Sequence, residues 1–544
     1  MFISRRNFLT GAAGAGIALA STASAAASRR VDVVFHGGTI VDGTGAPPYR
    51  SDLAILGDEI VAIGKVPDAA TRVIDVSGLH LAPGFIDMHS HSDAPILACP
   101  TADSRVRQGI TTECTGNCGS SAAPSPRARS GERGRSVAEY ADALEDAGIS
   151  LNHAMLIGQG SLRSNQIGLV DRALSKDERH GVATELKRAL RAGAFGLSTG
   201  LEYSPGRFTP PDEIHELARI VQSRDGLYAS HIRNEEAKLI PAIEEALEVG
   251  RATGVRVQIS HLKAAGKPNW PQMERAIALI EAARADGVDV MADAYPYTAY
   301  STGLSIFLPD WALDGGAAAT RTRLQSADDR KRLREEVGPR VMSDPGDYDL
   351  VVISSVSPKG DRACVGKNLR EIAAARNIEP VEAVLALLEE NDGEVSFVGH
   401  GMSEENVARV LAHPLVMIGS DGAAMTAPEP GKATTQPHPR SYGTYPRVLG
   451  YYVRERRVLD LPTAIRKMTS MPAERLGLRD RGRIAVGMKA DLVAFDADTV
   501  AETSTFDAPH NYPAGIVVVL VNGVAVVENG VHTGDRPGRV LRRS

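Results

Sequence analysis

The segment F-I-D-M-H-S-H-S at residues 85–92 carries the strongest signal in the sequence. An apolar run leads into His89 and His91, which lie two positions apart. In a β-strand, side chains at i and i+2 face the same side, so both imidazoles can converge on one metal ion where the strand ends. Two surface histidines after a strand would give the same pattern. The H-x-H pair therefore needs support from the rest of the chain.

Two other apolar runs also end in histidine. His231 follows Y-A-S at 228–230, and His261 follows V-Q-I-S at 257–260. A single histidine at such a place is usually a satisfied core or turn residue. In a parallel barrel, however, the carboxyl ends of all strands meet on one face, so four imidazoles would point into one mouth. Imidazole is a common ligand of zinc and related divalent ions.

A carboxylate follows the last apolar run of this kind. The segment V-M-I-G-S-D-G at 416–422 places Asp421 between two glycines. Alone, it would be read as an Asp-Gly turn without chemistry. Beside four strand-end histidines, Asp421 is a candidate to accept a proton from an attacking water and to return it to a leaving amine.

The segment T-G-N-C-G-S at 115–120 places Cys118 in a turn rich in glycine and asparagine. A buried cysteine is usually only a small apolar residue. At a strand end, its thiolate is a candidate soft metal ligand. We interpret Cys114 as core packing, and Cys99 and Cys364 as structural residues.

The middle of the chain alternates between short apolar strands and helices rich in Ala, Leu, Glu and Arg, which indicates a parallel α/β architecture. Expected helices include 211–223, 234–251, 271–286 and 403–412. We count nine strand candidates, near 84–89, 109–113, 153–158, 195–199, 227–231, 256–261, 288–294, 395–399 and 415–420. We expect a TIM-type (β/α)8 barrel over 81–480, in which one of the nine is an accessory strand. Residues 300–355 fit no strand–helix unit and are predicted to form a lid-like insertion beside the active-site face.

Both ends of the chain have a different sequence pattern from the middle. Residues 28–80 and 481–544 read as short β-branched strands between Gly, Asn and Asp turns, including the pair Asn522-Gly523. We expect one smaller β-sandwich domain built from the two ends.

The first 27 residues resemble a twin-arginine export signal. S-R-R-N-F-L-T at 4–10 is followed by a short, weakly apolar stretch and small residues. An uncleaved membrane anchor is the alternative, but the apolar run is far below the roughly 20 residues of a spanning helix. The sequence thus predicts a periplasmic or secreted protein, free of the membrane after signal cleavage.

The composition narrows the classes of partner. Lys and Arg number 61 against 67 Asp and Glu, for a net charge of −6. No basic excess points to nucleic acid or to an anionic membrane. Four cysteines in 544 residues cannot form a disulfide framework. The expected partner is a small-molecule substrate.

Together, these motifs resemble the amidohydrolase superfamily, and within it the N-acyl-D-amino-acid deacylase (D-aminoacylase) family. The H-x-H pair marks the superfamily, whereas T-G-N-C-G, S-H-L-K and H-P-R-S-Y-G-T-Y-P-R are narrower. The resemblance implies that Cys118, His231 and His261 bind a tight Zn2+. It also implies that His89 and His91, with Cys118, form a second and weaker site.

The resemblance assigns the remaining roles as well. It implies that Asp421 is the general base and then the general acid of amide hydrolysis. The residues that match substrate-holding positions are Tyr203, Lys263, Ser301 and Arg440. The Arg440 guanidinium suits bidentate binding of a carboxylate. Two departures are Glu113 and Glu202, extra carboxylates that can change substrate preference or touch the second metal.

The implied activity is hydrolysis of N-acyl-D-amino acids, or of dipeptides that contain a D-residue. The first alternative is another amidohydrolase activity, such as a dipeptidase or a cyclic amidase of the hydantoinase or dihydroorotase type. No strand-end lysine obviously supplies the carbamate bridge that the cyclic amidases use. The second alternative, a binding protein or inactive enzyme on the same scaffold, would require a broken set of site residues.

Overall fold

The computed structural model describes residues 30–67, 69–125 and 134–543. The signal peptide predicted for residues 1–27 lies outside these ranges. Among the described helices, none combines the length and the apolar character needed to cross a bilayer.

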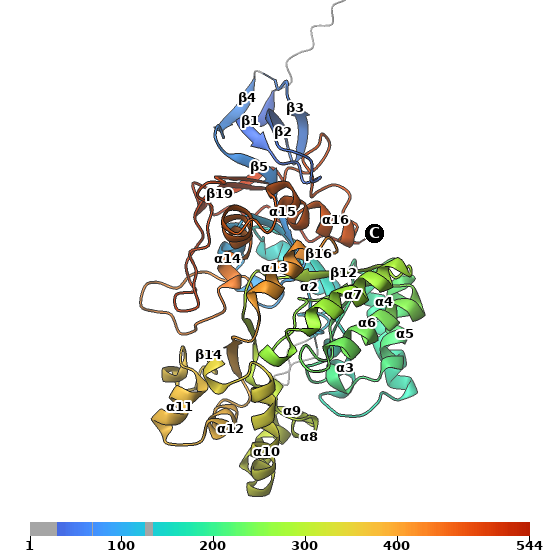
Figure 1. Cartoon of the computed structure of the whole chain (residues 1–544). Helices are drawn as coiled ribbons and strands as arrows, with labels where there is room; N and C mark the ends of the chain where they lie inside the picture. The colour runs from blue at the N-terminus through green and yellow to red at the C-terminus, as the bar shows by residue number, and fades with distance from the viewer. Residues whose placement is uncertain (1–29, 68, 126–133, 544) are drawn as a thin grey trace, which may run out of the picture.

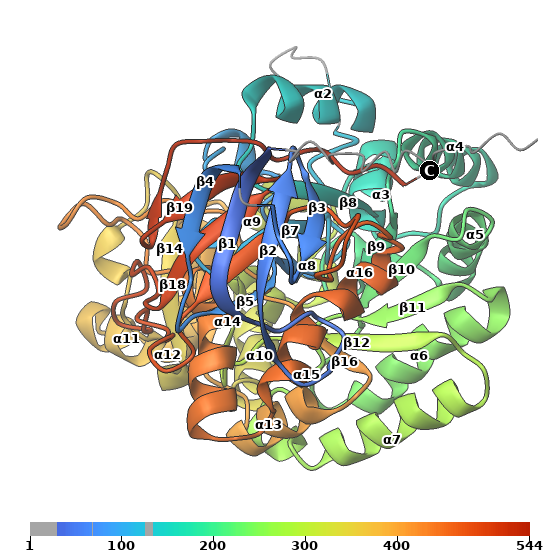
Figure 2. The same ribbon diagram turned by 90° about the horizontal axis from the view of Figure 1, so that it is seen from above.

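Eight parallel strands form the central sheet, and they account for eight of the nine strand candidates (Figure 2). In chain order they are β6 (Phe85–Asp87), β7 (Ile110–Thr115), β8 (Asn152–Gly158), β9 (Gly196–Gly200), β10 (Leu227–His231), β11 (Arg256–Ile259), β12 (Val290–Ala294) and β16 (Val416–Ile418). Each pairs with the next along this series. The sheet closes where the segments after β6 and β16 meet: His91 N–H donates to Gly422 O at 2.8 Å, and Asp421 N–H donates to His89 O at 2.8 Å. The structure therefore has the expected TIM-type barrel.

Helices cover the outside of the barrel (Figure 2). They are α1 (Asp103–Val106), α2 (Val137–Ala147), α3 (Gln159–Ile167), α4 (Lys176–Arg191), α5 (Pro211–Gln222), α6 (Leu239–Thr253), α7 (Gln272–Ala285), α13 (Glu404–Ala412), α14 (Arg440–Arg447), α15 (Leu461–Met468) and α16 (Ser470–Leu476). The sequence placed the start of α6 at residue 234. It begins five residues later because Asn234 Oδ1 accepts the N–H groups of Glu236 and Lys238 and holds a turn there.

The ninth candidate, 395–399, is the accessory strand. It is β15 (Val395–Gly399), the central strand of a separate antiparallel sheet with β13 (Tyr300–Gly303) and β14 (Val351–Val356). The helices of this unit are α8 (Asp310–Leu313), α9 (Gly316–Gln325), α10 (Ala327–Ser343), α11 (Leu369–Arg376) and α12 (Pro380–Glu390). Residues such as Leu333, Val337 and Phe397 give it a buried core of its own. The insertion expected at 300–355 thus belongs to a unit that extends to residue 399 and lies away from β1–β4 (Figure 1).

The two chain ends share one nine-stranded sheet. Its strands are β1 (Val31–Ile40), β2 (Tyr49–Leu56), β3 (Glu59–Ile63), β4 (Ala70–Asp75), β5 (His80–Pro83), β17 (Leu492–Phe495), β18 (Ile516–Val521), β19 (Val524–Glu528) and β20 (Val531–His532). β17 joins the halves by pairing antiparallel with β5. Residues of both halves, among them Phe35, Leu53, Leu492 and Leu520, bury their side chains in one apolar cluster.

Candidate metal centre and active site

Three side chains from separate barrel strands meet at the mouth of the barrel. His231 ends β10, while Cys118 and His261 lie in the turns after β7 and β11. His231 Nδ1 is 2.9 Å from His261 Nε2, which in turn is 3.3 Å from Cys118 Sγ. His261 Nε2 carries at most one hydrogen, so it can donate a hydrogen bond to only one of its two neighbours, His231 Nδ1 and Cys118 Sγ. Ligand atoms in a tetrahedral zinc site lie about 3.3 to 3.8 Å apart. The contact between His261 Nε2 and Cys118 Sγ has this spacing and the contact between the two histidines is shorter, while the nitrogen and sulfur donors are those that zinc binds.

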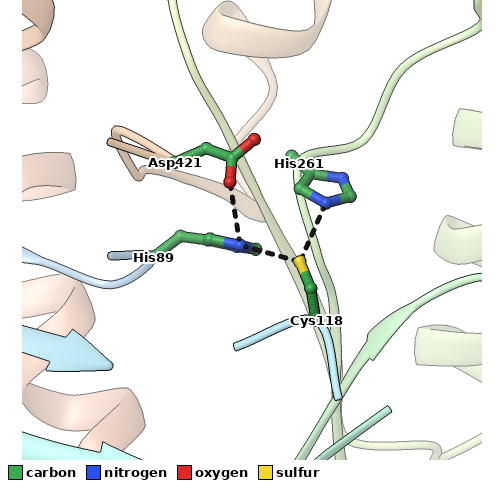
Figure 3. Close-up of side chains that lie close together, drawn as sticks. All are labelled: His89, Cys118, His261 and Asp421. Atoms are coloured by element: carbon green, nitrogen blue, oxygen red, sulfur yellow. Dashed lines mark hydrogen bonds and ion pairs between the residues drawn. The ribbon is translucent and has the colours of Figure 1, made fainter. Parts of the chain in front are cut away.

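A second group adjoins the first through Cys118 (Figure 3). His89 Nε2 lies 3.3 Å from Cys118 Sγ and 3.4 Å from Asp421 Oδ1. His91 Nε2 lies 2.9 Å from the same Asp421 oxygen. Cys118 therefore sits between the two groups, the place that a bridging ligand would occupy. The structure brings together all six residues that the sequence singled out, and their individual ligand roles stay predictions.

Three of these residues have a left-handed backbone conformation. The φ angles of Cys118, His261 and Asp421 are 51°, 33° and 53°. Such angles are uncommon for residues other than glycine and cost of order 1–3 kcal/mol each, so surrounding contacts must hold them. His261 N–H donates to Asp293 Oδ1 at 2.8 Å, and Asp421 N–H donates to His89 O. With this backbone conformation, the three side chains point toward one another at the mouth of the barrel.

Two carboxylates support the histidines and were missed by the sequence analysis. Asp293, near the end of β12, contacts His89 Nδ1 at 3.0 Å. Glu235 contacts His261 Nδ1 at 3.0 Å and Lys263 Nζ at 2.5 Å. Carboxylates behind metal-ligating histidines fix the ring orientation and the tautomer. Their positions in the sequence could have indicated this role, because each carboxylate lies within or just after a strand at whose end the site is built.

Electrostatics favour the ionised forms of the thiol and the carboxyl group. Burial opposes ionisation of the Cys118 thiol, but the positive charges of His89 and His261 prevail and hold its pKa well below its usual range. Burial likewise opposes ionisation of Asp421, yet Arg440 and His89 hold the pKa of that carboxyl well below its usual range. A thiolate is the form of cysteine that binds metals. An ionised Asp421 is the form that can take up a proton.

An open cavity of about 480 Å³ lies over these groups. Its lining includes Tyr203, Ser301 and Arg440, three of the four expected substrate residues. Arg440 Nη1 is 2.7 Å from Asp421 Oδ2, and Arg440 Nη2 donates to the backbone oxygen of Ser301 at 3.2 Å. The ring centroid of Tyr203 lies 4.5 Å from that of His231, and its hydroxyl accepts a hydrogen bond from Thr302 Oγ1 at 3.1 Å.

The fourth, Lys263, lines a smaller neighbouring cavity instead. Its ammonium group is buried against Glu235. Burial would lower the pKa of Lys263, but the charge of Glu235 outweighs it and raises that pKa above its usual range. In this structure Lys263 is therefore a charged partner of Glu235 behind His261.

The two unexpected carboxylates have different environments. Glu113 is fully buried behind the H-x-H segment, where its Oε2 accepts a hydrogen bond from Ser90 Oγ at 2.8 Å. Its other neighbours are Arg105 and His153, each at 3.6 Å. Glu202 lies at the mouth, with Oε2 3.0 Å from His231 Nε2. Of the two, only Glu202 contacts a residue of the metal centre.

A parallel barrel with cysteine, histidine and aspartate side chains at its carboxyl face defines a metal-dependent hydrolase of the amidohydrolase class. Residues 344–527 match the model described as the Amidohydrolase family. The chain is 39% identical to N-acyl-D-glutamate deacylase of Alcaligenes xylosoxydans xylosoxydans, covering 94% of this chain and 97% of the relative. It is 37% identical to D-aminoacylase of the same organism, covering 95% and 99%. The chain therefore belongs to the D-aminoacylase family of amidohydrolases.

Solved structures show the same relationship. N-acyl-D-glutamate deacylase of Bordetella bronchiseptica, complexed with zinc and a phosphonate mimic of the tetrahedral intermediate, matches with a TM-score of 0.80 and 35% identity, over 94% of this chain and 100% of that one. A D-aminoacylase described as having a binuclear metal centre matches with a TM-score of 0.79 and the same identity and coverage. L-hydantoinase of Arthrobacter aurescens, at 16% identity and a TM-score of 0.57, shares the fold.

Proposed function

We propose that this protein is a zinc-dependent hydrolase that cleaves the amide bond of N-acyl-D-amino acids, or of dipeptides that contain a D-residue. The products are a carboxylic acid, or the first amino acid, and a free D-amino acid. The observation that carries the proposal is the contact between Asp421 and Arg440 beside the Cys118 donor group, within one cavity. This contact supports proton transfer by Asp421 and carboxylate binding by Arg440 beside the metal donors. The family relationship supports the choice of substrate.

The donor set fits zinc, which when bound would polarise the acyl carbonyl and lower the pKa of water. Asp421 takes a proton from the attacking water, and the C–O bond forms at the acyl carbon. Asp421 then gives that proton to the amide nitrogen as the C–N bond breaks, so that the amine leaves. The Asp421 carboxylate is positioned for both transfers by its backbone bond to His89 O and by the nearby His91 ring.

Arg440 would bind the carboxylate of the D-amino acid. Its guanidinium group lines the cavity, and its fork can bind both oxygens of a carboxylate. The Tyr203 hydroxyl lines the same cavity and is a donor for the developing oxyanion. The metal donor group, Arg440 and the wall that receives the side chain give three points of contact, the number needed to distinguish D from L.

We also propose export of the protein to the periplasm or beyond, on the basis of the twin arginines at positions 5 and 6. N-acyl-D-amino acids or D-residue peptides from cell-wall turnover would be natural substrates there. Fractionation of cells that express the full chain, beside a variant with both arginines replaced by lysine, tests this point. Retention of the normal chain in the cytoplasm would contradict it.

A substrate panel tests the activity. Zinc-loaded protein is incubated with N-acetyl-D- and N-acetyl-L-amino acids, D-residue dipeptides, a hydantoin and dihydroorotate. We expect turnover of D-configured linear amides. Turnover of the cyclic amides instead would favour a cyclic amidase. Purification without stoichiometric zinc, together with no turnover, would favour a binding protein.

A further inference from the structure

Glu202 is a partly buried carboxylate at the mouth for which the proposed mechanism has no use. It follows β9, two residues after the strand ends. Its Oε2 lies 3.0 Å from Nε2 of His231, and the two side chains are only 12% and 3% exposed. A charge-assisted hydrogen bond between largely buried groups is stronger than one on the surface. The contact therefore constrains the His231 ring.

The other nitrogen of the same ring faces the metal donors. His231 Nδ1 is the atom that approaches His261 Nε2. A histidine that binds a metal must be unprotonated at the metal-facing nitrogen, so its single proton sits on the opposite one. In His231 that nitrogen is Nε2, which can donate only to what lies in front of it. In the described structure, the acceptor in front of it is Glu202.

The other two buried histidines of the centre also have a carboxylate at the outer nitrogen. His89 Nδ1 contacts Asp293 at 3.0 Å, and His261 Nδ1 lies 3.0 Å from Glu235 and 2.8 Å from Lys263 Nζ. In each case the opposite nitrogen, Nε2, faces Cys118. His231 reverses the ring, since its Nδ1 faces inward, and Glu202 supplies the matching outer carboxylate. Glu202 thus completes a set in which each buried imidazole has its own carboxylate.

We propose that Glu202 is a positioning residue that fixes the tautomer and ring orientation of His231 and thereby strengthens zinc binding. The inference rests on the proposed function only in taking zinc as the bound metal. Such outer carboxylates also raise the basicity of the ligand nitrogen, and their loss commonly weakens metal binding 10–100-fold.

A direct role in substrate binding is the rival explanation. Glu202 also lines a side cavity of about 440 Å³, together with Leu169, Ile306 and Leu313. A carboxylate in that wall would repel an acidic group of the substrate and attract a basic one. The two roles differ in what they change. A positioning residue alters zinc binding in the absence of substrate, whereas a substrate contact alters the ratio of rates between substrates.

The experiment compares Glu202→Ala and Glu202→Gln with the unchanged full-length zinc protein. Zinc affinity is measured by competition with a chelator, and zinc release by transfer to a chromogenic chelator. Glu236→Gln is the matched control, because Glu236 lies in the same acidic region but contacts no metal-centre side chain in the described structure. Burial and the charge of Glu202 raise the pKa of Glu236 to about 8. Kinetics are then recorded with N-acetyl-D-lysine, N-acetyl-D-leucine and N-acetyl-D-glutamate.

We expect Glu202→Ala to weaken zinc binding 10–100-fold and to release zinc faster. Glu202→Gln should lose less, because its amide oxygen still accepts the His231 proton, and Glu236→Gln should behave as the unchanged protein. At saturating zinc, any loss should fall on kcat and be similar for the three substrates. If the alanine variant does not fold, the glutamine variant alone tests the proposal. We then expect a measurable loss of zinc affinity in Glu202→Gln.

Unchanged zinc affinity and release rate in a folded Glu202 variant would overturn the proposal. The same holds if only the ratio of lysine to glutamate substrate rates changes, which would make Glu202 a substrate contact. Zinc binding that depends on Glu202, in a protein without deacylase activity, would support this inference and reject the proposed function alone.

Discussion

At the scale of the residue, Cys118 is the side chain that both groups of metal donors share. Its sulfur is within 3.3 Å of the Nε2 atoms of His89 and of His261. Figure 3 shows Cys118 in contact with both rings. A single sulfur therefore links the pair of histidines after β6 to the histidines of β10 and β11.

Replacement of Cys118 by alanine should remove the tight zinc. The thiolate is lost from both groups, and we expect zinc affinity to fall by more than the 10–100-fold typical for an outer partner. Metal content after dialysis measures this. Cys99→Ala is the control, because Cys99 is a free and partly exposed thiol outside the site. Stoichiometric zinc in the Cys118 variant would make Cys118 a packing residue.

Replacement of Asp421 by asparagine should retain zinc but lose turnover. The amide keeps the shape of the side chain but cannot accept and return a proton, so we expect kcat to fall about 10²–10⁴-fold. Steady-state kinetics and metal analysis of the same sample measure both properties. A rate near that of the unchanged protein would remove Asp421 from the mechanism.

Replacement of Arg440 by alanine should raise KM for substrates with a free carboxylate by about 10–100-fold, since a bidentate charged hydrogen bond contributes about 1.5–3 kcal/mol. The matched carboxamide substrates should change less. Arg440→Lys keeps the charge but not the fork, and it should be intermediate. Equal changes for acid and amide would argue against a carboxylate-binding role.

At the scale of the element, the seam between β6 and β16 decides the geometry of the site. His89, His91 and Asp421 all follow these two short strands, and backbone hydrogen bonds across the seam fix their relative position. Gly419 allows the close approach: a Cβ atom there would lie 2.8 Å from Cβ of His89. The alternation of apolar runs predicted both strands, but not that they are neighbours.

Gly419→Ala should therefore disturb the metal centre without changing a ligand. Overpacking at a tight backbone contact costs about 1–3 kcal/mol, and relief requires His89 to move. We expect a lower Tm and weaker zinc binding, measured by calorimetry and chelator competition. Gly338→Ala in α10 is the control, where the nearest atom would be the Tyr348 hydroxyl at 3.5 Å. A Gly419 variant with normal zinc affinity would show that the seam tolerates a methyl group.

At the scale of the whole molecule, the unit formed by residues 300–399 contains a buried carboxylate, Asp344, whose pKa depends on carboxylates at the mouth of the barrel. Asp344, at the end of α10, accepts a hydrogen bond from the Tyr300 hydroxyl. Burial and then the charges of Glu202 and Glu235 raise the pKa of Asp344 to about 7. The negative charges of Glu202 and Glu235 at the mouth of the barrel therefore influence the protonation of Asp344 in the insertion.

This raised pKa predicts a pH dependence of stability. Between the unfolded value near 4 and the folded value near 7, the folded protein keeps a proton that the unfolded chain has lost, so this contribution to the free energy of unfolding declines as pH rises. The Asp344→Asn variant has no carboxyl group at this position, so its free energy of unfolding lacks this decline with pH. Relative to the unchanged protein, its free energy of unfolding should rise by about 1 to 3 kcal/mol between pH 5 and 7.5. Denaturant titrations at both pH values measure the change, with exposed Asp328→Asn as the control. A constant difference between the proteins would contradict the prediction.

The sequence by itself determined the barrel, the two-ended second domain, and the residue types at the mouth. Strand period and apolar runs are local, so the chemistry at each strand end can be read without knowing its neighbours. The tertiary structure decided which strand is accessory, where the barrel closes, and which carboxylate supports each histidine. His89 and Asp293 are 204 residues apart, and Lys263 turned out to be the partner of Glu235. Such pairings depend on how distant segments pack, because a hydrogen bond in the interior is set by three-dimensional proximity and not by any local pattern.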